Sequence, residues 1–304
     1  MATRWTSKLT GQKIDETIDY VCNPNLLDNW YFANPVNQRG QTEYSGNKVY
    51  TIDRWMLSQA TGTLTVDSGQ ITYTAGTATV QIRQYIEAQL PDGYYTLSFL
   101  LPDKSIYYLV MKKSGNSYNY LKSDGSLGVT SAGVGAQVSS NNSKDTVFVY
   151  IPAGASLSLV AAKFEFGSQQ TLAHQDADGN WVLNEIPDYG EQLARCQRYY
   201  QVFDCTNAYV VIAFGHATET TVFRGLIPTL VAMRTTPAIE FTGASKSLVL
   251  HGNSSAVSAS SAPYSAIKAD INGAGFIMTV SSLTKKETYV LQAYGCKLEL
   301  RADL

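Results

Sequence analysis

Hydrophobic and polar positions alternate over short runs along most of this chain, which is the pattern of half-buried β-strands. The run TATVQIRQYIEA places Val80, Ile82 and Ile86 on one side, and the last run alternates Leu298 and Leu300 against charged neighbours. Similar runs recur between residues 25 and 167 and again from residue 208 to the end, separated by Gly, Pro, Asn or Asp. Short strands at this spacing, without intervening helices, predict an all-β fold of antiparallel, jelly-roll-like sandwiches.

One central segment, PDYGEQLARCQRYY, departs from this pattern and predicts a helix. Asp188 suits the N-cap, and Glu191 can complete a capping box three residues later. Leu193, Cys196 and Tyr200 then follow at helical spacing and share one face. Because about a dozen residues is marginal for an isolated helix, this face must pack on something. We interpret the segment as a connector between two β-domains.

A second, shorter helix is predicted over residues 10–21. Ile14, Ile18 and Val21 fall on one face, and Asn23-Pro24 ends the segment because proline disfavours the α conformation in the residue before it. The apolar stripe needs a partner surface, which its own domain, other copies of the chain or a larger assembly would supply. These three residues are the candidates for oligomerisation.

The pattern therefore divides the chain into four segments: an N-terminal helix (1–23), a first β-sandwich (24–168), a connector with the linker helix (169–200) and a C-terminal β-sandwich (201–304). A length of 304 residues is enough for two hydrophobic cores.

Composition and charge exclude several classes of partner. Charged residues make up only 16% of the chain and the formal net charge is -2, so we expect no nucleic-acid partner. We also expect no membrane insertion, because no stretch approaches the roughly 18 apolar residues of a spanning helix. The N-terminus lacks the apolar run of a secretory signal, which predicts folding in a cytosol. The four Cys are scattered, and we interpret them as small core residues.

Catalytic motifs are missing from the sequence. The three His are far apart, and no nucleophile elbow, HExxH, P-loop or dinucleotide fingerprint is present. Asp176, Asp178 and Asn180 have the spacing of a calcium loop, but Pro187 stands where the closing Glu belongs, so a plain turn is the favoured interpretation and a bound Ca²⁺ stays open. We therefore expect a protein that is not an enzyme and has no cofactor, although paired carboxylates can meet only in the fold.

Aromatic residues are the remaining chemical signal. Tyr107, Tyr108, Tyr118 and Tyr120 lie on adjacent predicted strands and are our candidates for carbohydrate binding, because exposed rings stack on the C–H faces of sugars. The alternative is a place in the core, since neighbouring strand residues point to opposite faces and one of each pair is then buried. Trp30 and Trp55 are predicted core residues.

The segment NPNLLDNWYFANPVNQRGQ followed by YTIDRWML resembles the opening of carbohydrate-binding-module-like jelly rolls in tail and fibre proteins of bacteriophages and prophages of gut bacteria. AAKFEFGSQQTL is similar to the strand that closes that domain, PDYGEQLARCQRYYQ to the helix that follows it, and LIPTLVAMRTTPAIEF with the final RADL to their C-terminal domains. HQDADGNW looks like an insertion. The resemblance implies a virion component, oligomeric and often a trimer, made in the bacterial host cytoplasm.

These observations lead to three hypotheses about function. The first is a non-catalytic tail-fibre or receptor-binding protein that attaches to host-surface glycan and contacts other virion proteins through its N-terminal segment. The second is a purely structural head-fibre, collar or baseplate protein, which large exposed apolar patches on the first domain, rather than a polar groove rimmed with aromatics, would favour. The third, a glycan depolymerase or esterase, requires a cleft with two carboxylates about 5–10 Å apart.

Overall fold

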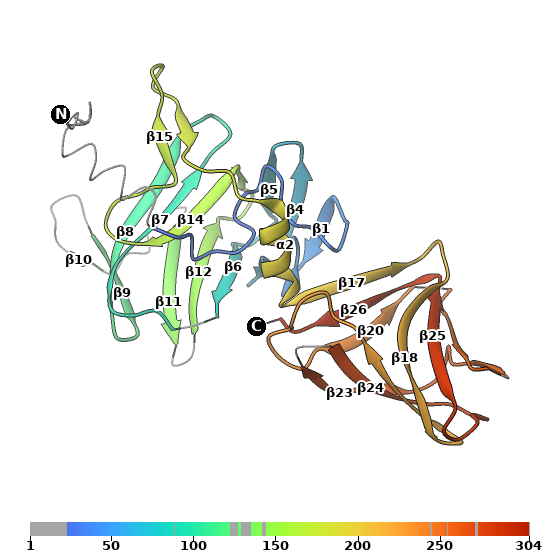
Figure 1. The fold of residues 1–304 in the computed structure, drawn as a ribbon. Coiled ribbons are helices and arrows are strands. Elements are labelled where there is room, and N and C mark those ends of the chain that lie inside the picture. Colours follow the sequence, from blue (N-terminus) through green and yellow to red (C-terminus); the bar gives the residue numbers. More distant parts are fainter. Residues whose placement is uncertain are drawn as a thin grey trace, which may run out of the picture. The chain divides into compact units, whose positions relative to one another are not determined.

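The computed structural model describes residues 23–87, 89–121, 127–128, 135–141, 144–243, 245–253, 255–270 and 273–303. Within these ranges the chain is mostly strand with one α-helix, and every strand pair is antiparallel. The expectation of an all-β, antiparallel fold is confirmed at this level. The chain divides into two compact units, of which unit 1 ends at Tyr189 and unit 2 begins at Gly190 (Figure 1).

Unit 1 contains three larger sheets and one hairpin, each named here after a central strand. The β8 sheet has the order β10 (Leu127–Gly128), β9 (Ser117–Leu121), β8 (Ile106–Ser114), β7 (Gly93–Leu100), β14 (Ala161–Phe166). The β12 sheet has the order β11 (Ala136–Asn141), β12 (Lys144–Ile151), β6 (Val80–Ile86), β3 (Met56–Ser58), β2 (Val49–Tyr50). The β4 sheet has the order β1 (Glu43–Gly46), β4 (Gly62–Asp67), β5 (Gln70–Ala75), β13 (Ser156–Leu159). The hairpin pairs β15 (Ala173–Gln175) with β16 (Trp181–Leu183).

The core of unit 1 follows from the alternation in the sequence. Val80, Ile82 and Ile86 of β6 are buried on one face, as their spacing predicts. Inward side chains of all three sheets join one hydrophobic cluster, which also contains Trp30 and Trp55. The prediction that both tryptophans are core residues is confirmed.

The segment after β14 is held on the outer face of the β8 sheet. Lys163 and Glu165 point to this face and are buried beneath Thr171. The Lys163 ammonium donates to the Thr171 hydroxyl at 2.8 Å, and the Thr171 backbone N–H donates to Glu165 at 2.7 Å. Burial raises the pKa of Glu165. This buried network explains why the residues up to Tyr189 belong to unit 1, whereas the sequence predicted a connector from residue 169.

Unit 2 contains two sheets. The β26 sheet has the order β17 (Tyr200–Cys205), β26 (Cys296–Arg301), β20 (Ala238–Thr242). The β18 sheet has the order β22 (Ala256–Ser258), β21 (Ser247–His251), β25 (Thr288–Tyr294), β18 (Val210–Glu219), β19 (Val222–Ile227), β24 (Gly273–Thr279), β23 (Tyr264–Asp270). Their inward side chains form a second hydrophobic cluster that includes Phe223, Phe276 and Leu298.

The central helix, α2 (Tyr189–Gln197), is shorter than the sequence predicted. It begins directly after Asp188, the predicted N-cap, and Glu191 lies in its first turn. Cys196 is buried and Leu193 is half-buried, but Tyr200 already belongs to β17, where it pairs with Arg301. The apolar helix face predicted by the sequence therefore does not extend to Tyr200, because this residue forms strand hydrogen bonds instead. The other predicted helix, with Ile14, Ile18 and Val21, lies outside the described residues.

Candidate functional site

The four candidate tyrosines fall into two environments. Tyr118 and Tyr120 of β9 are only 7% and 4% exposed, so neither ring can stack on a ligand at the surface. Residues two apart on a strand share a face, which corrects the expectation that one member of this pair is exposed. The Tyr120 hydroxyl accepts the Val138 backbone N–H at 3.3 Å, and burial raises its pKa to about 12.

Tyr107 and Tyr108 of β8 are both exposed at the surface, at 42% and 50%. They follow one another in the strand and so point to opposite faces of the sheet. Tyr107 pairs with Phe99 on the inward face, whereas Tyr108 pairs with Ser98 on the outward face. The structure therefore does not gather the four tyrosines into one binding surface.

The outer face of the β12 sheet carries a different set of aromatic and polar residues. Directly paired residues of neighbouring strands point to the same face, so the register places Arg83, Phe148 and Gln137 side by side in one row. Gln81 and Tyr150 form the next row, and Tyr85 follows on the other side of Arg83. We call this surface the aromatic face, and all its members are half-buried: Gln81, Arg83, Tyr85, Gln137, Phe148, Tyr150.

The side chains of the aromatic face hold one another in place. The rings of Phe148 and Tyr150 stack with centroids 6.4 Å apart and planes at 29°. The Tyr150 hydroxyl donates to Gln137 Oε1 at 3.0 Å, which fixes both groups. The Arg83 guanidinium lies 5.0 Å from the centre of the Tyr85 ring, so the cation is supported by the negative π-face. A surface with aromatic rings, amides and a guanidinium held in order is preorganised for a polar ligand.

This arrangement suits the recognition of a hydroxyl-rich molecule. Rings of Phe148 and Tyr150 offer apolar surface to the C–H side of a sugar, while the Gln81 amide offers donors to its hydroxyls. Arg83 Nε and Nη2 already donate to Met56 Sδ, at 3.3 and 3.1 Å, which leaves Nη1 of that guanidinium to face a ligand. None of the six residues that define the aromatic face is a carboxylate.

The sequence held a signal for the aromatic face that was not used. In TVFVYI, Val147, Val149 and Ile151 alternate with Phe148 and Tyr150. The β-branched residues are buried, so the aromatic residues between them must face outward. Large aromatic residues on the polar side of a strand therefore indicate an outward-facing aromatic surface better than aromatic residues that are adjacent in the sequence.

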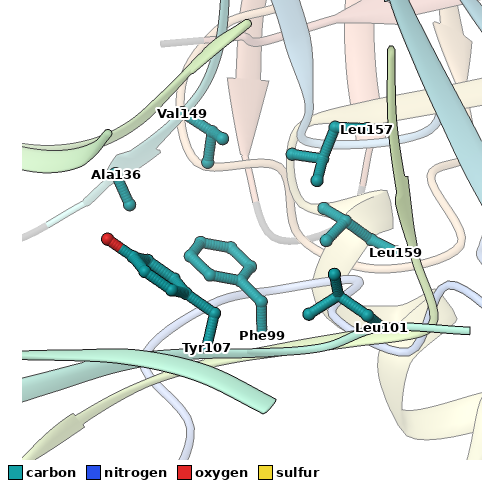
Figure 2. A pocket seen from close by; sticks show the side chains of 7 residues that line it. All are labelled: Phe99, Leu101, Tyr107, Ala136, Val149, Leu157 and Leu159. Carbon is teal, nitrogen blue, oxygen red and sulfur yellow. The ribbon is translucent and has the colours of Figure 1, made fainter. Parts of the chain in front are cut away.

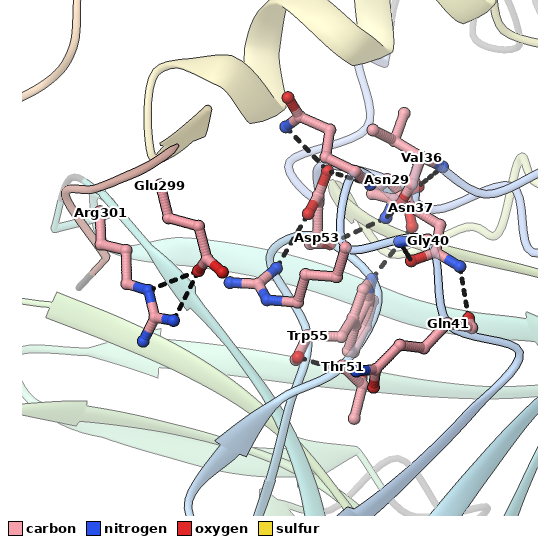
Figure 3. A network of polar contacts seen from close by, with 12 residues as sticks. Asn29, Val36, Asn37, Gly40, Gln41, Thr51, Asp53, Trp55, Glu299 and Arg301 are labelled. Carbon is pink, nitrogen blue, oxygen red and sulfur yellow. Dashed lines mark hydrogen bonds and ion pairs between the residues drawn. The ribbon is translucent and has the colours of Figure 1, made fainter. Parts of the chain in front are cut away.

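The loops that precede the first strands build a polar network in unit 1 (Figure 3). The Asn29 amide donates to the carbonyls of Val36 and Asp53, both at 2.8 Å, and Asn29 Oδ1 accepts the Val36 N–H at 2.7 Å. The buried Asp53 carboxylate accepts from Arg39 and Gln38, each at 2.9 Å. All of these groups satisfy one another, so their role is to fix the loops that enter the first strands rather than to bind a ligand.

A separate ion pair lies in unit 2, on β26 (Figure 3). The Arg301 guanidinium donates twice to Glu299 Oε2, at 3.0 Å from Nε and 2.5 Å from Nη2. Burial alone would raise the pKa of Glu299, but the hydrogen bonds and charge of Arg301 outweigh it and the pKa is lowered. The pair stabilises the sheet and offers no free acid.

The calcium-loop candidate is the turn of the β15–β16 hairpin. Asp176 Oδ1 accepts the backbone N–H groups of Asp178 and Asn180, at 3.0 and 2.9 Å. These bonds lower the pKa of Asp176, the bond from Asn180 being the larger cause. The carboxylate therefore serves the turn itself. Across the described ranges, no three His, Cys, Asp or Glu side chains are grouped so as to hold a metal ion.

The outer face of the β18 sheet in unit 2 carries a group of apolar side chains among polar ones, since Gln292 pairs with both Val211 and Val249, and His251 pairs with Val290. Phe214 pairs with Val290 on one side and Leu226 on the other, and Val211 lies in the next row. Phe214 and Val211 are 50% and 51% exposed. At one end Tyr294 stacks on Tyr209, with centroids 4.7 Å apart. We call this surface the apolar face: Val211, Phe214, Leu226, Val249, Val290, Tyr294.

Comparisons with known proteins assign no family to this chain. No protein-family model and no curated protein matches it. Two solved structures of oxalate decarboxylase, the second a variant of the Bacillus subtilis enzyme, match with 9% and 8% identity and TM-scores of 0.13 and 0.12. Both alignments cover 100% of this chain and 86% of the other. Likenesses this weak carry no argument about fold or activity. In the described part of the chain, no helix has the length and apolar character needed to cross a membrane.

Proposed function

We propose that this chain is a non-catalytic virion protein that attaches to carbohydrate on the surface of a bacterial host through the aromatic face of unit 1. The observation that carries the proposal is the stacked pair of Phe148 and Tyr150, with Arg83 and two glutamine amides beside it. Aromatic rings stack on sugar C–H groups, and the guanidinium and amides bond the hydroxyls. Such sites bind weakly one at a time, so attachment gains strength when several copies act together.

The virion setting rests on the resemblance of the N-terminal, central and C-terminal segments to phage tail and fibre proteins. In this proposal each unit is a separate β-sandwich domain, α2 joins them, and the N-terminal segment with Ile14, Ile18 and Val21 contacts other virion proteins. The chain acts as a homo-oligomer, with a trimer as the expected form. The aromatic face offers no carboxylate pair, which supports binding over depolymerase or esterase activity.

The test is binding of labelled full-length protein to host cells before and after enzymatic removal of surface polysaccharide. We expect saturable binding to untreated cells and its loss on stripped cells. Binding that survives stripping would point to a protein receptor, and absent binding to untreated cells would reject the attachment role.

The apolar face of unit 2 favours a second candidate function, that of a structural virion component. Phe214 and Val211 expose apolar surface at the centre of a seven-stranded sheet. Contiguous apolar patches of this kind mark protein-interaction sites. We propose that other copies of this chain cover the face. A structural component would self-associate through the apolar face and would not bind host glycan. An adhesin would both self-associate and bind host glycan.

A further inference from the structure

A pocket in unit 1 lies on the inward side of the β8 and β12 sheets, away from the aromatic face. Seven side chains line it (Figure 2): Phe99, Leu101, Tyr107, Ala136, Val149, Leu157, Leu159. They come from β7, the turn after it, β8, β11, β12 and β13, so all three larger sheets contribute. The pocket volume is about 170 Å³.

The lining is apolar except at one point. Among the seven side chains only Tyr107 carries a polar atom, and Figure 2 shows its hydroxyl at the Ala136 side of the pocket. Phe99, Val149 and Leu159 are buried, whereas Tyr107 is 42% exposed. The pocket therefore opens to solvent beside the tyrosine and is closed by aliphatic and phenyl side chains farther in.

Water does not suit this pocket. A buried water needs two to four polar partners, and the side chains here supply one hydroxyl. An enclosed apolar cavity of about 150 Å³ lined by Leu, Ile and Phe stays dry and takes up benzene, and the inner part of this open pocket has a similar lining. Protein cores otherwise pack to the density of organic crystals, so an unfilled space of this size leaves its lining without van der Waals partners.

We propose that the pocket binds a single aromatic ring that carries a polar substituent. The ring would fill the space between Phe99, Val149 and Leu159, and the substituent would remain at the mouth, within reach of the Tyr107 hydroxyl. Burial raises the pKa of Tyr107, so at neutral pH its hydroxyl is protonated and can either donate or accept. The ligand class is thus small phenols and related monocyclic aromatics, free or as the terminal group of a larger molecule.

The inference is independent of the proposed attachment function, because the pocket and the aromatic face lie on opposite sides of the β12 sheet. Val149 and Ala136 point inward, whereas their neighbours Phe148 and Gln137 point outward. Failure of one proposal therefore leaves the other intact.

The test uses the full-length chain and 4-methylphenol, with toluene as a second probe and glucose as a negative control. Methyl NMR signals of Val149, Leu157 and Leu159 are followed during titration. We expect saturable shifts of these signals with both aromatic probes and none with glucose. Absence of shifts up to the solubility limit of both aromatic probes would overturn the proposal.

Matched variants locate the binding. Ala136→Leu fills the pocket and should lower the affinity for both aromatic probes more than tenfold. Ser139→Leu introduces the same side chain on the other face of the same strand, outside the aromatic face, and should leave the affinity unchanged. Tyr107→Phe should lower the affinity for 4-methylphenol about fivefold and leave the affinity for toluene unchanged.

Leu157→Phe provides a second pocket-filling variant should Ala136→Leu fail to fold, which amide NMR spectra would reveal. Undiminished binding in a folded pocket-filling variant would overturn the proposal, as would equal losses in Ala136→Leu and Ser139→Leu.

Discussion

The outer faces of two sheets, one in each unit, are built by the same rule and surround their exposed rings with different neighbours. On both, every second residue of a strand faces outward, and cross-strand pairs set the rows. On the aromatic face of unit 1, Phe148 and Tyr150 alternate with Arg83 and glutamine amides across the rows, and Tyr150 is hydrogen-bonded to Gln137. On the apolar face of unit 2, Phe214 lies between Val290 and Leu226.

The difference teaches that the neighbours of an exposed ring indicate its partner better than the ring itself. A ring beside hydrogen-bonding groups can bind a molecule that is apolar on one side and polar at its edge, as a sugar is. A ring beside Val and Leu offers only apolar area, which another protein surface buries well. On this basis we propose glycan binding for unit 1 and self-association for unit 2.

The largest effect is expected from removing both rings of the aromatic face. In the Phe148→Ala, Tyr150→Ala double variant we expect the affinity for host polysaccharide to fall about 100-fold, with about 1.4 kcal/mol lost per ring. Calorimetric titration of purified polysaccharide measures this. Phe214→Ala and Tyr108→Ala are the controls and should keep full affinity; a loss in either of them would erase the distinction between the faces.

Self-association is the next test of the comparison. Phe214→Lys places a charge at the centre of the apolar face, and we expect the mass in solution to fall from that of an oligomer to 33.2 kDa, the mass of one chain. Sedimentation velocity gives the mass. Phe148→Lys, the same change on the aromatic face, should leave the mass in solution unchanged. If only the Ile14→Asp, Ile18→Asp variant yields single chains, the N-terminal segment holds the oligomer instead.

The ion pair on β26 provides a pH test that involves neither face. Because the pKa of Glu299 is lowered in the folded protein, its contribution to stability is present above the ordinary Glu pKa and is lost as pH falls through the lowered value. In Arg301→Gln the buried Glu299 carboxylate loses its main partner, so its pKa should rise and the dependence of stability on pH should reverse.

For the same variant we expect about 0.5–1 kcal/mol less unfolding free energy at pH 7, since Arg301 is partly exposed. Urea denaturation between pH 3 and 7 measures the unfolding free energy and its dependence on pH. A variant that keeps the wild-type slope would show that other groups lower the pKa.

The smallest effects separate the two buried tyrosines of β9. Tyr120→Phe removes the acceptor of the Val138 N–H and should cost about 1 kcal/mol of unfolding free energy. The Tyr118 hydroxyl lies near the buried Asp145 carboxylate but makes no hydrogen bond of good geometry among the described residues, so Tyr118→Phe should cost less than Tyr120→Phe. Both variants should bind polysaccharide normally. Weakened glycan binding in either one would return these tyrosines to the list of contact residues.

Local patterns in the sequence predicted the strands well and the candidate site poorly. Alternation at Val80, Ile82 and Ile86 identified both the strand and its buried face. The sequence predicted that α2 continues to Tyr200, beyond its observed end. Helical spacing of apolar residues gives no information on the pairing of Tyr200 with Arg301, which is far away in the sequence.

The same limit explains the tyrosines. Their positions in two successive strands suggested a shared surface, but only strand register shows that Tyr107 pairs with Phe99, and only the fold shows that Tyr118 and Tyr120 are covered. Conversely, Arg83 and Phe148 lie side by side although 65 positions separate them, and no local pattern predicts that pairing.

The most direct test of the account is NMR of full-length protein with ¹³C-labelled phenylalanine and tyrosine rings, titrated with an oligosaccharide of the host surface. The account predicts that ring signals of Phe148, Tyr150 and Tyr85 shift in a saturable way while those of Phe214 and Tyr294 stay fixed. Shifts confined to Phe214 and Tyr294, or no shifts at saturating oligosaccharide, would contradict the assignment of glycan binding to the aromatic face.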